Sequence, residues 1–252
     1  MSTRNRKLNL SGLNAVSRGL MAEVIVIVIA AIVAAARLTG APQLIAAVIL
    51  LVFFVLSILL IVLGLSSASR FSGRFLHASR IYLLFLAILG AGICAAGVHI
   101  LFLGQEGEPL SRTMTMACVV FLLVLILLEG IGFAATLSGC SRIAGQYEDR
   151  RSSVWCSLIA IAYLVLIVLL VVLAVLFLRN GAAVVTEVIE EHAGGIADFN
   201  AFYGRMKPFV IMLLLFAGGL LARVLLRAAA AGRIQSIYRK FHGKARQTEI
   251  AG

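Results

Sequence analysis

The strongest constraint in this sequence is a set of six long apolar runs separated by short polar segments. The hydrocarbon core of a bilayer is about 30 Å thick, and a helix that rises 1.5 Å per residue crosses it in about 20 residues. Five runs meet this length clearly, and the first is weaker because Glu23 interrupts it near its start. In chain order the runs are 19–36, 44–65, 81–103, 114–137, 154–178 and 208–226. The chain therefore has enough apolar length to cross a membrane six times.

Composition agrees with this pattern. Hydrophobic residues make up 62% of the chain, charged residues only 13%, and the mean hydropathy is +1.08. Soluble domains contain about 45–50% apolar and about 25% charged residues, so a soluble globular protein is excluded. Backbone groups in lipid must be paired within a helix or a closed barrel. Because the runs lack alternation with a period of two, we predict an all-α, polytopic transmembrane bundle whose six spans form three consecutive hairpins.

Polar segments divide the chain into three parts. Residues 1–18 form a basic N-terminal segment, 19–232 hold the transmembrane helical domain, and 233–252 form a basic amphipathic tail. The longest connection in the domain, 179–207, places apolar residues on helical faces, so we expect two short amphipathic helices there. The last span then begins at Pro208, because proline is favoured in the first turn of a helix.

The first apolar run allows two interpretations. Basic residues precede it and it ends in three alanines, as in a signal peptide that is cleaved after Ala36. Against cleavage, Leu10, Leu13, Val16 and Leu20 recur at helical spacing, as in an interfacial helix that leads into a span. We expect the first span to be retained.

Basic residues are distributed unevenly between the two sides of the membrane. If the N-terminus is inside, 15 of the lysines and arginines outside the spans lie in inner segments and 5 in outer ones. Cytoplasmic loops carry the excess of Lys and Arg, so we predict that both termini face the cytoplasm, in a plasma or inner membrane. Three of the five outer cations, Arg179, Arg205 and Lys207, belong to the last outer connection.

Four ionisable residues lie inside the predicted spans. Glu129 and Arg223 each stand about 15 residues from the outer start of their span, which is about 22 Å along the helix. Arg227 follows one turn deeper on the same face, and Glu23 reaches a similar level from the inner side. Each such group costs about 2.5–3.5 kcal/mol to insert, which favours pairing of opposite charges. We expect Glu129 to pair with Arg223, and Glu23 to pair with Arg227 or Arg223.

These four charges have two interpretations. In the first they are a buried clamp that orients the helices, with Arg227 extending toward the membrane interface. In the second they form a charged gate or a binding site for an ion or an anionic solute. The sequence leaves both open.

The C-terminal tail is predicted to contact lipid headgroups. Its apolar residues recur at helical spacing, and its cations are Arg233, Arg239, Lys240 and Lys244. A basic amphipathic helix beside the membrane binds anionic lipids of the inner leaflet. A nucleic-acid partner is not expected, because the sequence has no zinc module, helix-turn-helix unit or aromatic platform.

The sequence contains no motif that indicates catalysis, a metal or a cofactor. A nucleophile elbow, a zinc-binding HExxH and a phosphate-binding glycine loop are all absent, so we expect a protein that is not an enzyme. The four cysteines have no CxxC spacing and indicate no disulfide framework.

Two functional classes remain from the sequence. The intramembrane charges, the glycine-rich third span and the outer amphipathic connection favour a channel or transporter component. The second and fifth spans consist almost entirely of Leu, Val, Ile and Ala, which favours a non-catalytic scaffold or accessory subunit instead. Such a scaffold would act as a homo-oligomer or with a partner membrane subunit. We favour the first class.

Overall fold

The computed structural model describes residues 11–36, 40–98, 112–147, 149–177, 179 and 199–250. Within this part of the chain the regular elements are helices, and six of them are long and apolar enough to cross a membrane. They are α1 (Ser11–Ala35), α2 (Ala41–Ala68), α3 (Gly73–Val98), α4 (Arg112–Gln146), α5 (Arg150–Leu176) and α7 (Phe199–Ile250). The predicted all-α transmembrane bundle of six spans is confirmed.

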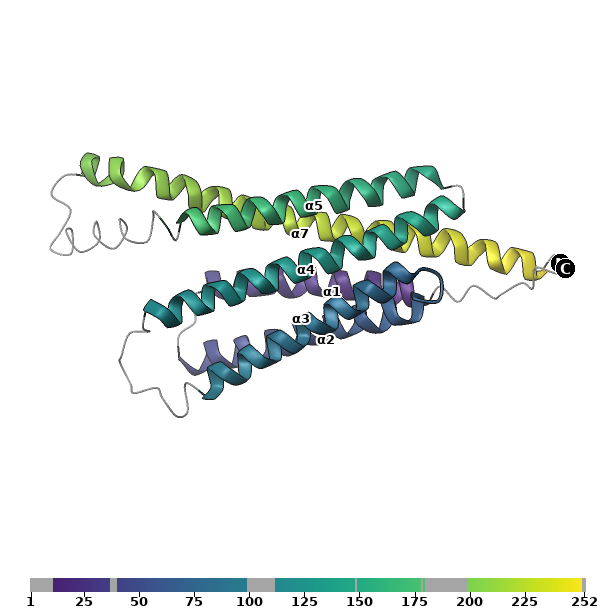
Figure 1. Cartoon of the computed structure of the whole chain (residues 1–252), viewed down its shortest axis with the longest axis horizontal. Coiled ribbons are helices and arrows are strands. Elements are labelled where there is room, and N and C mark those ends of the chain that lie inside the picture. The colour runs from purple at the N-terminus through teal and green to yellow at the C-terminus, as the bar shows by residue number, and fades with distance from the viewer. Residues whose placement is uncertain are drawn as a thin grey trace.

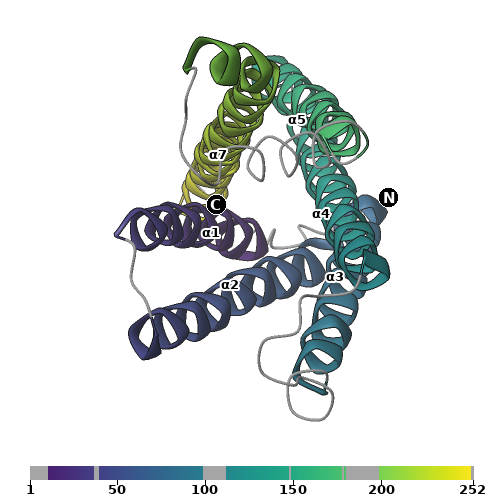
Figure 2. The same ribbon diagram turned by 90° about the vertical axis from the view of Figure 1, so that its left-hand side faces the viewer.

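The helices form a closed ring in chain order. Each helix packs against the next one along the chain, and α7 returns to pack against α1 (Figure 2). The two helices of each expected hairpin are therefore neighbours, and the three hairpins join side by side. This arrangement brings α1, α4, α5 and α7 around a common interior.

Packing is dense at one end of the ring only. We call the end that holds the α4–α5 connection and the C-terminal part of α7 the tail end, and the opposite end the far end (Figure 1). The buried residues of α1 lie between Gly12 and Glu23, and those of α2 between Ser57 and Ala68, which are the tail-end halves of both helices. Toward the far end the helices diverge, and large apolar side chains such as Leu44 are up to 68% exposed.

Helix α1 extends the first span toward the N-terminus, as the helical spacing of Leu13, Val16 and Leu20 indicated. The expected basic segment ended at residue 18, but α1 is helical from Ser11 onward. Leu13, Val16 and Leu20 are fully buried in the core, so the prediction of an interfacial helix at these residues was wrong. Their helical spacing reflects packing against other helices, which produces the same periodicity as contact with a membrane surface.

Helix α7 is longer than the predicted last span and tail together. It runs for 52 residues and contains Pro208 in its interior, so proline does not open the span as expected. No boundary separates the span from the tail at residue 233, because the helix continues through Gly232. The remaining part of the expected outer connection, residues 180–198, lies outside the described residues, as do residues 99–103 of the third predicted span.

Close contact between helices depends on glycine at particular positions. Gly12 of α1 and Gly64 of α2 cross so closely that a Cβ on Gly64 would lie 2.6 Å from the carbonyl oxygen of Gly12. Helices in lipid associate through such packing, since apolar surface gains nothing by leaving a lipid solvent. In the glycine-rich third span, a Cβ on Gly92 would meet the ring of Phe121, whereas a Cβ on Gly90 would meet no atom of another helix within 4 Å.

The connection between α4 and α5 is tight and capped. Asp149 is the N-cap of α5, and its side chain accepts a hydrogen bond from the backbone N–H of Ser152 at 3.3 Å and from the Ser152 hydroxyl at 2.9 Å. A carboxylate at this position satisfies backbone donors that have no partner within the helix. The cap fixes the start of α5 and therefore the height of α5 beside α4.

Candidate functional site

The four predicted intramembrane charges come together inside the ring. Glu23 belongs to α1, Glu129 to α4, and Arg223 and Arg227 to α7. Glu23 and Arg227 are 0% exposed and Glu129 is 1% exposed, while the side chain of Arg223 is 17% exposed. They lie in the tail-end half of the bundle, where the helices converge.

Each guanidinium group contacts a carboxylate. Arg223 Nη2 donates to Glu129 Oε2 at 2.5 Å. Arg227 forms ion pairs with both Glu23 and Glu129. The expected pairs Glu129–Arg223 and Glu23–Arg227 are thus confirmed, and the additional contact of Arg227 with Glu129 links them. Three helices, α1, α4 and α7, are joined through one side chain.

Tyr163 of α5 lies at the centre of these charges. Its hydroxyl donates to Glu129 Oε1 at 2.8 Å and accepts a hydrogen bond at 2.9 Å from the Nε of both Arg223 and Arg227. A phenol has one proton and two lone pairs, so this hydroxyl uses its whole hydrogen-bonding capacity. We call Glu23, Glu129, Arg223, Arg227 and Tyr163 the charge network.

Aromatic rings enclose the network on one side. The Phe133 ring lies 4.2 Å from the Tyr163 ring between centroids, and the guanidinium carbon of Arg227 lies 5.6 Å from the centre of Phe133 and 5.7 Å from that of Tyr163. Rings at this distance attract a cation through their negatively charged faces. Tyr82 of α3 is also buried, and its hydroxyl has no hydrogen-bond partner among the described residues.

The network balances two carboxylates against two guanidinium groups. Burial of charge is costly, and a buried pair compensates only when its remaining hydrogen bonds are satisfied. Arg227 meets it in part: its Nε donates to Tyr163, whereas its two Nη atoms form ion pairs with Glu23 and Glu129. Neither these Nη atoms nor the two carboxylate oxygens of Glu23 have a hydrogen-bond partner among the described residues. Arg227 is fully enclosed, so the prediction that it extends toward the membrane interface was wrong.

Sequence reasoning missed Tyr163 and Phe133. Tyr163 stands within the fifth apolar run, which was interpreted as almost entirely Leu, Val, Ile and Ala. Its hydroxyl could have indicated a role in the network, because a hydroxyl in the middle of a span needs a hydrogen-bond partner inside the protein. Phe133 follows Glu129 by one turn on the same face of α4, but a phenylalanine in an apolar run carries no comparable signal.

The expected headgroup-binding cations lie on the tail part of α7. Arg233 stacks on Trp155, with its guanidinium carbon 5.2 Å from the ring centre. Lys240 donates to Asp149 Oδ2 at 2.8 Å, so it holds the tail against the start of α5. Arg239 is exposed next to it. The side chain of Lys244 lies outside the described residues.

This contact affects the titration of Asp149, which lies outside the spans. The hydrogen bond from the Lys240 ammonium, with those from Ser152, favours the charged carboxylate and lowers the pKa of Asp149 below its ordinary value. The contact therefore favours an ionised Asp149 in the folded protein.

Metal-ligating side chains do not cluster in the part of the chain that the structure describes. Histidine, cysteine and acidic residues form no group of three or more there that is able to hold an ion. All four cysteines are free; Cys140 and Cys156 are buried, whereas Cys94 and Cys118 are exposed on the surface of the bundle.

Comparisons with known proteins add no assignment to this geometry. No protein-family model, curated protein or solved structure matches the chain. Function is therefore argued from the charge network and the surfaces around it.

Proposed function

We propose that the chain is a component of a membrane channel or transporter, without enzymatic activity, in which the charge network closes the tail end. One observation carries this proposal: Arg227 joins Glu23 of α1 and Glu129 of α4 at the level where the ring becomes densely packed. Beyond that level, toward the far end, the helices diverge. A solute path between the diverging helices would therefore be closed where the charge network lies.

Ionised groups are suited to such a closure. They are rare inside membranes, and where they occur they commonly mark pathways for ions or solutes. Removal of one partner from a buried pair destabilises the paired state by about 3–5 kcal/mol, so a substitution at one carboxylate is expected to loosen such a closure. Interfaces of this type switch between discrete arrangements and do not deform continuously.

Accessibility of a cysteine below the network tests the proposal without knowledge of the solute. Leu137 lies on α4, two turns from Glu129 toward the tail end, and is fully buried. In a background without the native cysteines, Leu137→Cys is expected to react slowly with a membrane-impermeant methanethiosulfonate reagent. Glu129→Gln leaves the arginines in excess and is expected to raise this rate at least about tenfold.

Two further variants make the test specific. Glu129→Gln combined with Arg223→Gln restores charge balance, and we expect the labelling rate to return toward that of the parent. Asp149→Asn removes a carboxylate outside the spans and serves as the matched control with no change in rate. Equal labelling of Leu137→Cys in all of these variants, each eluting as a folded protein, would contradict a gate.

A non-catalytic scaffold or accessory subunit is the second candidate. It is favoured by the enclosure of the network, since Glu23, Glu129 and Arg227 are at most 1% exposed. The network would then be a clamp, and other copies of the chain or a partner membrane subunit would cover the diverging helices. This candidate predicts no solute flux in proteoliposomes and a defined assembly after purification in mild detergent.

The tail is proposed to bind anionic lipids of the inner leaflet in either case. Arg233, Arg239, Lys240 and Lys244 would each contribute on the order of 1 kcal/mol near such a surface. Arg233 supports this placement, because its partner Trp155 is of the residue type that is enriched at membrane interfaces. Both termini would face the cytoplasm, in a plasma or inner membrane.

A further inference from the structure

The exposed side chains of the spans change from apolar to polar toward the tail end. On α2 the exposed residues are apolar from Leu44 to Leu63, and Ser66 is the first exposed polar residue after them. On α5 the exposed residues are apolar from Val154 to Leu176. Both stretches are about 30–35 Å long, which matches the hydrocarbon core of a bilayer. We call the level at which they end on the tail side the hydrocarbon edge.

On α1 this edge lies at Arg18. The side chain of Arg18 is exposed, and every exposed residue that follows it in α1 is apolar. A Cβ on the adjacent Gly19 would lie 2.6 Å from Cγ1 of Ile61 on α2, so Arg18 is level with the end of the apolar stretch of α2. Because the ring is densely packed at this end, an exposed side chain here points outward, toward the surrounding membrane.

On α3 the edge lies at Arg80. Its side chain is exposed and is followed by the exposed Leu83. The ring of Phe85 lies 6.3 Å from that of Phe54 on α2, measured between centroids. Since α2 and α3 are antiparallel, Arg80 is level with Leu59 of α2, about one turn from the end of the apolar stretch of that helix.

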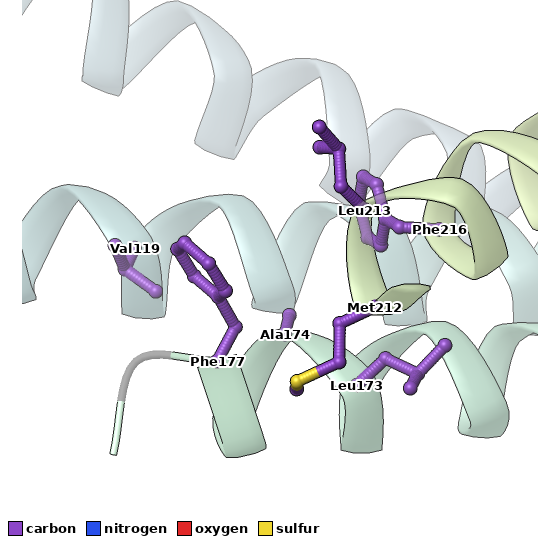
Figure 3. A pocket seen from close by; sticks show the side chains of 7 residues that line it. All are labelled: Val119, Leu173, Ala174, Phe177, Met212, Leu213 and Phe216. Atoms are coloured by element: carbon purple, nitrogen blue, oxygen red, sulfur yellow. The ribbon is translucent and has the colours of Figure 1, made fainter. Parts of the chain in front are cut away.

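Packing density changes near the same level. The buried residues of α1 and α2 lie in the tail-end halves of these helices. Toward the far end, the cavity of about 290 Å³ between α4, α5 and α7 is lined by apolar side chains such as Leu173 and Phe216 (Figure 3). Apolar side chains pack together to leave water, but they gain nothing by leaving lipid. Diverging helices are therefore expected for the half in lipid, and dense packing for the end that extends into water.

The charge network lies a short distance inside this edge. Trp155 of α5 is at the edge and stacks with Arg233 of α7, as is common at membrane interfaces. Arg227 precedes Arg233 by six residues, and Glu23 follows Arg18 by five. These separations are about 8–9 Å along the helices.

We propose that Arg18 and Arg80 bind phosphate groups of the lipid leaflet at the tail end, at a level that leaves the charge network about 8–9 Å inside the hydrocarbon. Both side chains are exposed at the edge, and among the described residues no carboxylate pairs with either of them. A guanidinium group matches a phosphate in charge and donates two parallel hydrogen bonds to it.

This lipid contact is separate from that of the tail, because the two arginines belong to α1 and α3. It applies equally to a transporter and to a scaffold, so it does not rest on the proposed function.

The depth of tryptophan in the bilayer tests the level of the edge. Trp155 is the only tryptophan of the chain, so the native protein carries one reporter at the edge. In a Trp155→Phe background, Met21→Trp and Leu83→Trp place reporters three residues beyond the two arginines, toward the far end. Val165→Trp places a reporter about 15 Å farther along α5 than Trp155. All three substituted positions are exposed.

The proteins are reconstituted in phosphatidylcholine vesicles in which a fraction of the lipid is brominated either near the headgroup or near the bilayer centre. We expect bromine near the headgroup to quench Trp155, Met21→Trp and Leu83→Trp more strongly, and bromine near the centre to quench Val165→Trp more strongly. The reverse order at any of these reporters would overturn the proposed level. Leu63→Trp on α2 replaces a reporter variant that fails to fold.

Local lipid preference tests the two arginines. Quenching by phosphatidylglycerol brominated near the headgroup, relative to phosphatidylcholine brominated at the same position, measures the preference for anionic lipid at each reporter. Arg18→Gln should lower this preference about fivefold at Met21→Trp and leave it unchanged at Leu83→Trp, and Arg80→Gln should do the reverse. Arg18→Lys and Arg80→Lys keep the charge and are the matched controls, in which the preference is retained.

Two results would overturn the assignment of the arginines. An unchanged preference at the neighbouring reporter after Arg18→Gln or Arg80→Gln would show that the substituted arginine does not contact headgroups. Equal losses at both reporters after either substitution would indicate a general attraction of anionic lipid to a positively charged protein.

Discussion

Two buried tyrosines near the same arginines differ in what their hydroxyls do. The Tyr163 hydroxyl contacts Glu129, Arg223 and Arg227, whereas the Tyr82 hydroxyl has no hydrogen-bond partner among the described residues. The free-energy contribution of a buried hydroxyl depends on this difference. A satisfied one leaves unpaired polar groups behind when it is deleted, and an unsatisfied one does not.

Tyr163→Phe is therefore expected to destabilise the protein by about 1–3 kcal/mol, because one carboxylate and two guanidinium groups each lose a partner. Tyr82→Phe is the matched control, with an expected change below about 0.5 kcal/mol. Thermal unfolding of the two variants in detergent measures the difference. If both variants lose the same stability, the central position of Tyr163 in the network is contradicted.

The four charged residues of the network could be predicted from the sequence. Ionisable residues are rare inside a span, and opposite charges at one depth favour pairing. Depth along a helix was sufficient to match Glu129 with Arg223, but it left either Arg227 or Arg223 as the partner of Glu23. It was not sufficient to place Tyr163, because the rotation of α5 relative to α4 and α7 is set by packing across the ring. The double contact of Arg227 depends on the same relative rotations.

At the scale of elements, the α1–α2 pair shows how closely two helices approach where a glycine of each stands at the crossing. Gly64→Ala places a methyl group about 2.6 Å from a backbone oxygen of Gly12, so one helix has to move. We expect a loss of about 1–3 kcal/mol in stability, as for other overpacked positions. Gly218→Ala is the control, because a Cβ there meets nothing within 4 Å and alanine favours the helix by up to about 1 kcal/mol.

Thermal unfolding of the two alanine variants compares these effects directly. A stable Gly64→Ala protein that unfolds at the temperature of the parent would contradict the close crossing of α1 and α2. A Gly218→Ala protein that loses as much stability as Gly64→Ala would show that alanine at any helical glycine of this bundle is unfavourable.

The contact between Lys240 and Asp149 joins the tail part of α7 to the start of α5, and it gives the protein a pH dependence. Because the folded state lowers the pKa of Asp149, its contribution to stability is present above the ordinary pKa of an aspartate, near 4, and disappears as the pH falls through the folded value. A pair in which Lys240 is 49% exposed contributes about 0.2–1 kcal/mol.

Asp149→Asn isolates this contribution, since asparagine still caps a helix. We expect the wild-type protein to be the more stable of the two at pH 7, and the difference to shrink as the pH falls below about 4. Unfolding temperatures of both proteins across this range provide the measurement. A difference that is constant with pH would exclude a charged Asp149 as its source.

Helix ends were the least predictable feature at this scale. Apolar runs mark the part of a helix that lies in lipid, but α4 and α7 continue well past their runs at the tail end. There the helices pack against each other through residues such as Cys140, Ile143 and Ile234, and protein contacts replace lipid. Hydropathy therefore indicates which part of a helix lies in lipid, but it does not indicate the residue at which the helix ends.

At the scale of the whole molecule, an even number of spans places both chain ends on one side of the membrane. The distribution of basic residues predicts that this side is the cytoplasm. Tags at the two ends should both be digested by protease in inside-out vesicles and protected in right-side-out vesicles. Digestion of the tags from opposite sides would contradict six spans.

The closed order of the ring and its dense tail end were not predictable from the sequence. An apolar run does not indicate which of its faces contacts lipid and which contacts a neighbouring helix, because apolar side chains pack against both. Only the small residues and the charges distinguish the packed half from the diverging half. Their positions, such as Gly12 against Gly64, become meaningful once the helices are placed side by side.

The continuity of α7 has a mechanical consequence. Arg223, Arg227 and Lys240 stand on one helix, and the sequence has no proline between Arg223 and the end of the chain that would let the helix bend sharply. A protein or a lipid surface that tilts α7 near Lys240 therefore also moves both guanidinium groups, which lie about 20–25 Å away along the same helix. A force on the tail end of α7 and a rearrangement of the charge network in the interior are therefore mechanically coupled.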